Sequence, residues 1–194
     1  MPPRARKGIR ALSRPVEYGT DGDFASALKE IREAPDRAAA IVGAAIVEDA
    51  LRWALNSFFI LQITENEERE LFENNGVLSS FHAKILMGFA LGLFGEAARN
   101  DLSRIRNIRN AFAHAPRSIG FATSEVANEC AKLCYINAIA KNSDRSILST
   151  KPLADEGPRA RFLATVNILI LDLHIVGGKG EEAEEHIKKL GGMP

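Results

Sequence analysis

The sequence predicts an all-α protein, folded as an antiparallel helical bundle of about six to eight helices. Apolar residues recur at helical spacings along most of the chain, and residues typical of helix starts and stops divide these stretches. No strand-turn-strand pattern occurs. With 194 residues and 46% apolar content, the chain is long enough to bury the core of one ordinary domain.

Three parts are expected along the chain. Residues 1–22 contain several prolines, glycines and arginines but no apolar periodicity, so we expect a flexible basic arm. Residues 23–176 are expected to form the helical domain. Residues 177–194 begin with a glycine-rich segment, which predicts a hinge followed by a charged C-terminal helix.

The first two helices are expected over residues 24–34 and 36–61. Asp36 is a typical N-cap residue at the start of the second, and the apolar stripe of this helix marks it as a core helix. Glu48 and Arg52 stand four residues apart on it, a spacing that favours an ion pair along the helix surface.

Caps and breakers delimit the remaining helices. Thr64 and Glu67 form a capping box. Pro116 prevents the helix expected over residues 96–114 from extending much further. Thr165 to Val176 is rich in β-branched residues, but its length favours a helix. The expected helices cover residues 64–75, 81–94, 96–114, 123–138 and 158–176.

The composition limits the classes of function. Basic and acidic residues number 25 each, so no net field draws the molecule onto a polyanion, and any nucleic-acid site must be local. Cys130 and Cys134 have no histidine pair at zinc-site spacing and form no disulfide framework. We therefore expect a cytoplasmic protein with no metal and no cofactor.

The longest apolar run gives no sign of a membrane span. It covers residues 166–176, is too short to cross a bilayer and contains Asp172 and His174. No membrane partner is expected.

A polar stripe lies on the helix expected over residues 96–114. Arg106, Asn110 and His114 are spaced four residues apart and share one face. Arg109 lies about 140° around the helix from His114 at ~100° per residue, but its side chain is long enough to approach the imidazole. The arginine and the histidine could therefore share one anion.

These residues carry a resemblance to a known superfamily. Arg109, Asn110 and His114 reproduce the R-N-x-x-x-H form of the R-x4-6-H motif of HEPN proteins. The segments 79–85, 90–93 and 105–110 resemble the mannitol operon repressor family, which is itself HEPN-like. The similarity covers roughly residues 36–176 and implies a HEPN-type bundle.

In catalytic HEPN proteins the motif forms a metal-independent ribonuclease site where two protomers meet. The resemblance therefore implies a homodimer and an RNA-directed site, as in endoribonucleases of a toxin or defence type. A histidine with a pKa near neutral can move the proton of a ribose hydroxyl, which is the role expected of His114. Arg109 would clamp the phosphoryl charge, and Asn110 would bond the phosphate or the imidazole.

Three further residues are assigned to substrate binding. Arg106 shares the polar stripe, and Lys84 matches the family pattern and could reach a phosphate. Glu48 lies on the helix that would face the motif and could orient Arg109 or His114. Two of them also have a simpler interpretation: Glu48 as the surface partner of Arg52 on the same helix, and Lys84 as a surface lysine that covers apolar residues with its stem.

The alternative function is a non-enzymatic regulator or interaction module that resembles the mannitol operon repressor. In that case the Arg-Asn pair would bond loop carbonyls, and His114 would cap the helix. A protein or nucleic-acid partner fits this alternative. Direct operator recognition is its weakest form, because no helix-turn-helix with an exposed basic recognition helix is evident.

Overall fold

The computed structural model describes residues 23–59, 63–140 and 157–189, and every regular element in these ranges is a helix. This confirms the all-helical prediction, with a number of helices inside the expected range of about six to eight. The predicted basic arm, residues 1–22, lies outside the described residues. The helices are α1 (Asp23–Glu33), α2 (Asp36–Ser57), α3 (Glu65–Phe72), α4 (Phe81–Ala90), α5 (Glu96–His114), α6 (Ser124–Ala131), α7 (Tyr135–Ala140) and α9 (Pro158–Lys189).

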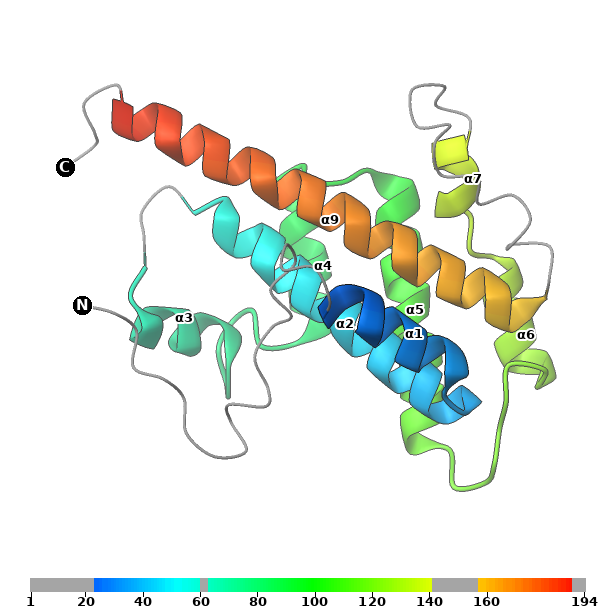
Figure 1. Cartoon of the computed structure of the whole chain (residues 1–194). Helices are drawn as coiled ribbons and strands as arrows, with labels where there is room; N and C mark the ends of the chain where they lie inside the picture. The colour runs from blue at the N-terminus through cyan, green and yellow to red at the C-terminus, as the bar shows by residue number, and fades with distance from the viewer. Residues whose placement is uncertain (1–22, 60–62, 141–156, 190–194) are drawn as a thin grey trace.

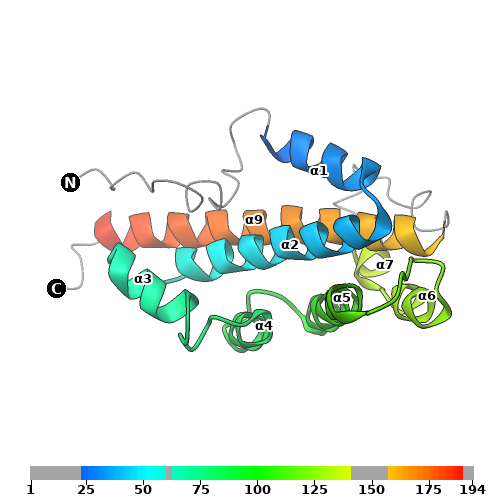
Figure 2. The ribbon, with the colours of Figure 1, turned by 90° about the horizontal axis from the view of Figure 1, so that it is seen from below.

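The bundle is organised around two long helices. Helices α2 and α9 lie side by side and form a central layer (Figures 1 and 2). Helices α4, α5 and α6 form a second layer on one side of this pair, while α1 packs on the other side (Figure 2). Helix α2 contacts α1, α4, α5 and α9, so it is the centre of the core.

Small residues allow α9 to approach α2 closely. A Cβ atom added to Gly43 would lie 3.5 Å from Phe162 and 3.7 Å from Val166, both on α9. Helix α2 is otherwise rich in fully buried alanines, whose small side chains let neighbouring helices pack closely against it. The buried alanines of α2 are Ala39, Ala40, Ala44, Ala50 and Ala54.

The predicted hinge after residue 176 is wrong, because α9 continues as one helix to Lys189. A Cβ atom on Gly177 would lie 2.0 Å from the ring of Trp53 on α2. The ring of Trp53 also stacks on His174, with 4.9 Å between the ring centroids. Gly177 is therefore required by helix packing, not by a break in the chain.

Several other helix boundaries differ from the prediction. Helices α2 and α3 end at Ser57 and Phe72, before the expected residues 61 and 75. Helix α4 ends at Ala90, four residues early, and the turn that follows places Gly92 at a φ of 71°, a conformation that favours glycine. The single helix expected over 123–138 is divided into α6 and α7. The carboxylate of Asp101 on α5 accepts hydrogen bonds from the backbone N–H groups of Cys134 (2.9 Å) and Tyr135 (2.7 Å), which starts a new helix there.

The apolar run of α9 belongs to the core. Residues 158–178 are long and apolar enough to cross a membrane by length and composition, and more than half of that stretch is buried inside the bundle. Its buried side chains pack against α2, as expected for the core helix of a bundle.

Candidate functional site

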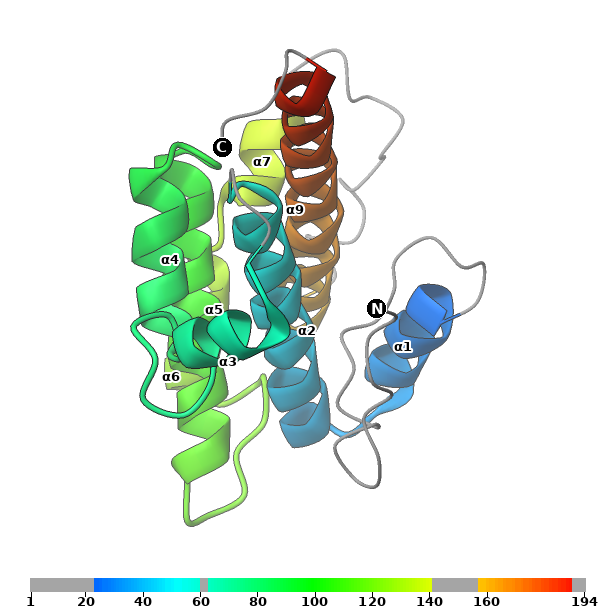
Figure 3. The same ribbon diagram turned by 90° about the vertical axis from the view of Figure 1, so that its left-hand side faces the viewer.

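Three helices meet at a cluster of charged side chains formed by Glu48, Lys84 and Arg109. Oε1 of Glu48 on α2 lies 2.6 Å from Nζ of Lys84 on α4, and Oε2 lies 3.4 Å from Nη2 of Arg109 on α5. Helices α4 and α5 lie side by side next to α2 (Figure 3). One carboxylate thus ties both outer helices to the central one.

The three side chains of the cluster differ in how deeply they are buried. The side chain of Lys84 is 5% exposed, that of Glu48 is 17% exposed and that of Arg109 is 33% exposed. Lys84 also donates to the carbonyl oxygen of Ser79, so its charge is compensated on two sides. A lysine this deeply buried needs a counter-ion, and Glu48 provides it.

These contacts correct two interpretations of the sequence. Lys84 is buried and paired, so it is not a surface lysine that merely covers apolar residues with its stem. Glu48 does not pair with Arg52 along α2. Arg52 instead contacts Glu68 on α3 at 2.8 Å and Glu73 at 3.6 Å.

The polar residues of the motif helix make mostly local contacts. Arg109 donates through Nη1 to Oδ1 of Asn110 at 3.0 Å, so Asn110 helps Glu48 to orient the guanidinium. Arg106 donates through Nη2 to Oδ1 of Asn107 at 3.1 Å. The expected proximity of Glu48 and Arg109 is therefore present, whereas Arg106 is not part of the cluster.

His114 is the last residue of α5, and it is exposed. Within the described residues, no hydrogen bond or ion pair connects its ring to Arg109 or Glu48. The chain beyond it is fixed by Arg37, which donates to the carbonyl oxygens of Ala115 (3.1 Å) and Arg117 (3.0 Å). The position of the histidine backbone is thus well determined while the imidazole faces solvent.

Aromatic packing holds the same end of α5 against the core. Phe112 packs on Phe121, and Phe121 packs on Phe162 of α9, with 5.1 Å between the ring centroids in each pair. Asp36 accepts a hydrogen bond from the backbone N–H of Phe121 and pairs with Arg159. Asp36 was expected to cap α2, but its carboxylate instead joins the start of α2 to the segment after α5.

The cysteines offer no reactive site. Burial raises the pKa of Cys130 to about 12, so the thiolate needed for nucleophilic attack is not formed near neutral pH. Cys134 donates its thiol to Asp101. In the part of the chain that the structure describes, no group of three or more histidine, cysteine or carboxylate side chains could hold a metal ion.

The exposed side of α4 is apolar. Leu86 is 45% exposed, Met87 38% and Leu91, which follows the helix, 49%. The opposite side of the helix is buried and presents Phe81 and Ile85 to the core. We call Leu86, Met87 and Leu91 the α4 face.

Some structural residues could not be recognised from the sequence. Arg37 and Asp101 each form hydrogen bonds with backbone groups that are distant in sequence. The nearest such group is 78 residues from Arg37 and 33 residues from Asp101. Backbone partners leave no residue-type pattern, so neither spacing nor composition indicated these roles.

Comparisons with known proteins support the fold. No family model matches the sequence, and no curated protein matches it. Two solved structures are similar to the chain. The structure of the MtlR-HPr complex from Escherichia coli matches with a TM-score of 0.57 and 13% identity, covering 77% of this chain and 96% of that one.

The second structure is a possible transcriptional regulator, YggD, from Shigella flexneri 2a. It matches with a TM-score of 0.51 and 17% identity, and the match covers 82% of this chain and 98% of that one. Identities this low show a shared fold and not a shared activity. The chain therefore has the fold of MtlR and YggD, in agreement with the resemblance that its sequence indicated.

Proposed function

We propose that this chain is a non-enzymatic regulator or interaction module that acts by binding another protein through the α4 face. The exposure of Leu86, Met87 and Leu91 on one side of a helix carries this proposal. Adjacent large apolar side chains left in contact with water are typical of surfaces that bind a partner. Methionine and leucine also adapt their rotamers to the shape of a partner surface.

The fold comparisons support binding of a protein. The similar MtlR chain was solved in complex with HPr, and YggD is described as a possible transcriptional regulator. A bundle of this shape can therefore serve as a platform for another polypeptide. We expect the complex to form in the cytoplasm.

The charged cluster supports a structural role for most of the motif. Lys84 is buried against Glu48, and the same carboxylate contacts Arg109. Two of the three cations that were assigned to phosphate or substrate binding, Lys84 and Arg109, are thus already paired with an anion. A phosphate would have to compete with Glu48 for these groups and would be repelled by its charge.

Co-purification from cells that naturally contain the protein tests the proposal. The tagged chain, its Leu86→Asp variant and its Val77→Asp variant are compared by quantitative mass spectrometry. Val77 is more exposed than Leu86 but lies outside the α4 face, so it is the matched control. We expect a protein partner that is retained by the wild type and by Val77→Asp, and is depleted at least about tenfold by Leu86→Asp. The same set of proteins with all three chains would contradict the proposal.

A second candidate is a HEPN-type ribonuclease, and one observation favours it. Arg109 is oriented by Asn110 while one third of its side chain is exposed, and His114 is exposed at the end of the same helix. In this candidate the chain is a homodimer that brings two copies of His114 to one cleft, with Arg106 near the phosphates. Glu48 and Lys84 act indirectly, by positioning Arg109.

The second candidate has its own test. Purified protein should cleave single-stranded RNA in the presence of EDTA and leave a 2′,3′-cyclic phosphate. His114→Ala should reduce cleavage by about 10² or more while the helical content is unchanged. Arg117→Ala is the control, because Arg117 is exposed near His114 but outside the motif. Intact RNA after prolonged incubation would leave protein binding as the function.

A further inference from the structure

Two arginines on the outer side of α5 have no carboxylate partner among the described residues. Helix α5 contains four arginines, of which Arg104 and Arg109 each pair with a carboxylate of another helix. Within the described ranges, Arg99 and Arg106 take part in none of the ion pairs. The side-chain acceptor of Arg106 is the neutral amide of Asn107. We call Arg99 and Arg106 the basic border.

The basic border lies beside the α4 face. Cζ of Arg99 lies 4.5 Å from the centroid of the Phe89 ring on α4. Phe89 is half-buried and follows Leu86 by three residues, so it flanks the α4 face on the side toward α5. Helices α4 and α5 lie side by side (Figure 3), and the short turn between them makes them antiparallel. Arg106 is two helical turns beyond Arg99, about 10 Å along α5, and therefore lies beside the first half of α4.

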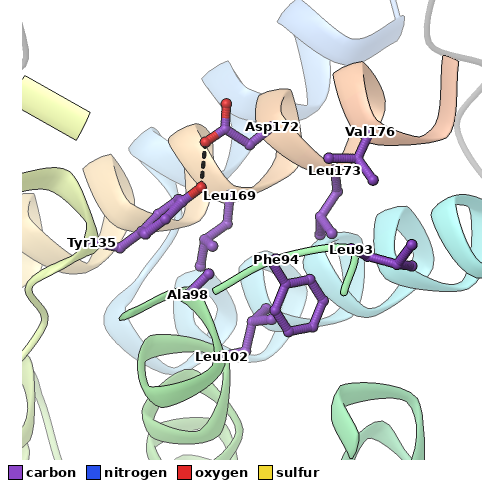
Figure 4. Close-up of a pocket in the computed structure, with 9 residues that line it drawn as sticks. All are labelled: Leu93, Phe94, Ala98, Leu102, Tyr135, Leu169, Asp172, Leu173 and Val176. Carbon is purple, nitrogen blue, oxygen red and sulfur yellow. Dashed lines mark hydrogen bonds between the residues drawn. The ribbon is translucent and has the colours of Figure 1, made fainter. Parts of the chain in front are cut away.

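Packing fixes the turn that joins the two helices. Leu93 and Phe94 line a pocket together with Leu102 of α5 and Leu173 of α9 (Figure 4). The ring of Phe94 also packs on α4, since a Cβ atom added to Gly88 would lie 2.7 Å from it. The α4 face and the basic border are thus held in one arrangement, and a partner meets a surface that is already ordered.

This surface is a local excess of positive charge on a chain whose charges balance. No acidic residue occurs from residue 76 to residue 95. Residues 97–124 contain one, Asp101, which is fully buried and accepts backbone N–H groups. Glu48, from α2, already lies between two cations, and Glu96 is exposed in the first turn of α5. Carboxylates of a partner would therefore be attracted to the basic border.

We propose that the partner of the α4 face presents an acidic amphipathic helix, whose apolar stripe covers the α4 face and whose carboxylates pair with the basic border. This inference rests on the proposed protein-binding function and specifies the chemistry of the partner. Met87 and Leu91 are four residues apart, the spacing at which an amphipathic helix presents its own apolar anchors. Arg99 and Arg106 are seven residues apart, so carboxylates two turns apart on the partner helix would face both.

A nucleic acid fits this surface less well. Its affinity comes from the neutralisation of several phosphates, and the basic border supplies only two cations. Leu86, Met87 and Leu91 offer no hydrogen-bond donor to a phosphate. An acidic protein helix uses both the apolar and the charged part of the surface.

Selection from a displayed peptide library tests the chemistry of the partner. The library consists of helices of about 20 residues with a leucine stripe, and the positions on both sides of the stripe vary among Glu, Lys and Gln. Peptides are selected on the full chain as wild type, as Leu86→Asp and as the charge reversal Arg99→Glu with Arg106→Glu. The matched control, Lys29→Glu with Arg117→Glu, makes the same change in net charge at exposed residues outside this surface.

The wild type and the control should enrich Glu over Lys by about tenfold on one side of the stripe, because attraction replaces repulsion at both arginines. The charge reversal should enrich Lys at those positions, and Leu86→Asp should enrich no peptide. Circular dichroism checks that each variant is folded. If the charge reversal does not fold, Arg99→Gln with Arg106→Gln replaces it and should remove the preference for Glu.

The outcomes separate this inference from the proposed function. Peptides that depend on Leu86 but show no preference for Glu, or show the same preference with the charge reversal, overturn the acidic partner and leave the α4 face as a binding surface. Enrichment of no peptide, or enrichment that does not depend on Leu86, overturns both. A labelled single-stranded RNA is tested on the same variants. RNA binding that is lost with the charge reversal, without a preference for Glu among the peptides, assigns the basic border to nucleic acid and overturns the inference.

Discussion

Replacing Glu48 by glutamine should destabilise the fold far more than an equivalent change at the surface. The change leaves the ammonium of Lys84, which is only 5% exposed, without a charged partner. Removing one member of a buried ion pair costs about 3–5 kcal/mol. Because Glu48 itself is 17% exposed and glutamine still accepts a hydrogen bond, we expect the lower end, about 3 kcal/mol.

Glu129 provides a matched control. It also contacts two cations, Lys132 at 2.6 Å and Arg104 at 3.3 Å, which nearly repeats the two distances at Glu48. The side chains of this second cluster are 31–54% exposed, so water already compensates their charges. Glu129→Gln should therefore lower the free energy of unfolding by less than about 1 kcal/mol. The two variants differ mainly in burial, which is the property that the prediction tests.

Urea unfolding followed by circular dichroism measures the difference. With a slope of about 2–3 kcal/mol per molar urea for a chain of this size, Glu48→Gln should lower the midpoint by about 1 to 1.5 M. Lys84→Met should by itself lower the free energy of unfolding only slightly, because Arg109 still pairs with Glu48. Adding Lys84→Met to Glu48→Gln should restore about 2 kcal/mol of the lost free energy of unfolding, since the double variant has no unpaired charge buried at position 84. Equal midpoints for Glu48→Gln and Glu129→Gln would refute the argument.

Two further predictions concern the contact between α2 and α9. Gly177→Ala should lower the melting temperature, because its Cβ would lie 2.0 Å from Trp53. Gly178→Ala should raise the melting temperature, because no atom lies within 4 Å of its added Cβ and alanine stabilises a helix by about 0.5–1 kcal/mol relative to glycine. Thermal unfolding followed by the fluorescence of the single tryptophan reports both variants, and a shift of the same sign in the two would contradict this account. Burial lowers the pKa of His174 below its ordinary value of 6.5, so the unfolded chain takes up a proton that the folded ring does not. Stability should therefore fall as the pH drops below about 6.5 toward the folded-state pKa, and His174→Phe, which keeps a ring beside Trp53, should remove that part of the pH dependence in urea titrations. An unchanged pH profile in the variant would assign the dependence to other groups.

Local patterns allowed much of the fold to be predicted. The capping box of Thr64 and Glu67 is present, and the motif helix ends at His114, as expected. Each of these features depends on residues within one or two turns of one another. Local chemistry is therefore sufficient to place most helix starts and the candidate motif.

Long-range contacts explain the errors. The glycines after residue 176 indicated a hinge, but at Gly177 the residue type is set by the ring of Trp53 on another helix. The break between α6 and α7 depends on Asp101, 33 residues before Cys134. Glu48 selects partners 36 and 61 residues away over its neighbour on the same helix. No short-range spacing carries this information, so tertiary packing decided these positions.

Site-specific photo-crosslinking at position 86 tests most directly the claim that the α4 face binds a protein. A photoreactive phenylalanine analogue replaces Leu86 in one variant of the full chain. In a second variant the analogue replaces Asn128, an exposed residue of α6. Both are irradiated in cells that naturally contain the protein, and the products are identified by mass spectrometry. The account predicts one dominant product between position 86 and a different protein, with no corresponding product from position 128. Products only with a second copy of the chain, or identical products from both positions, would contradict it.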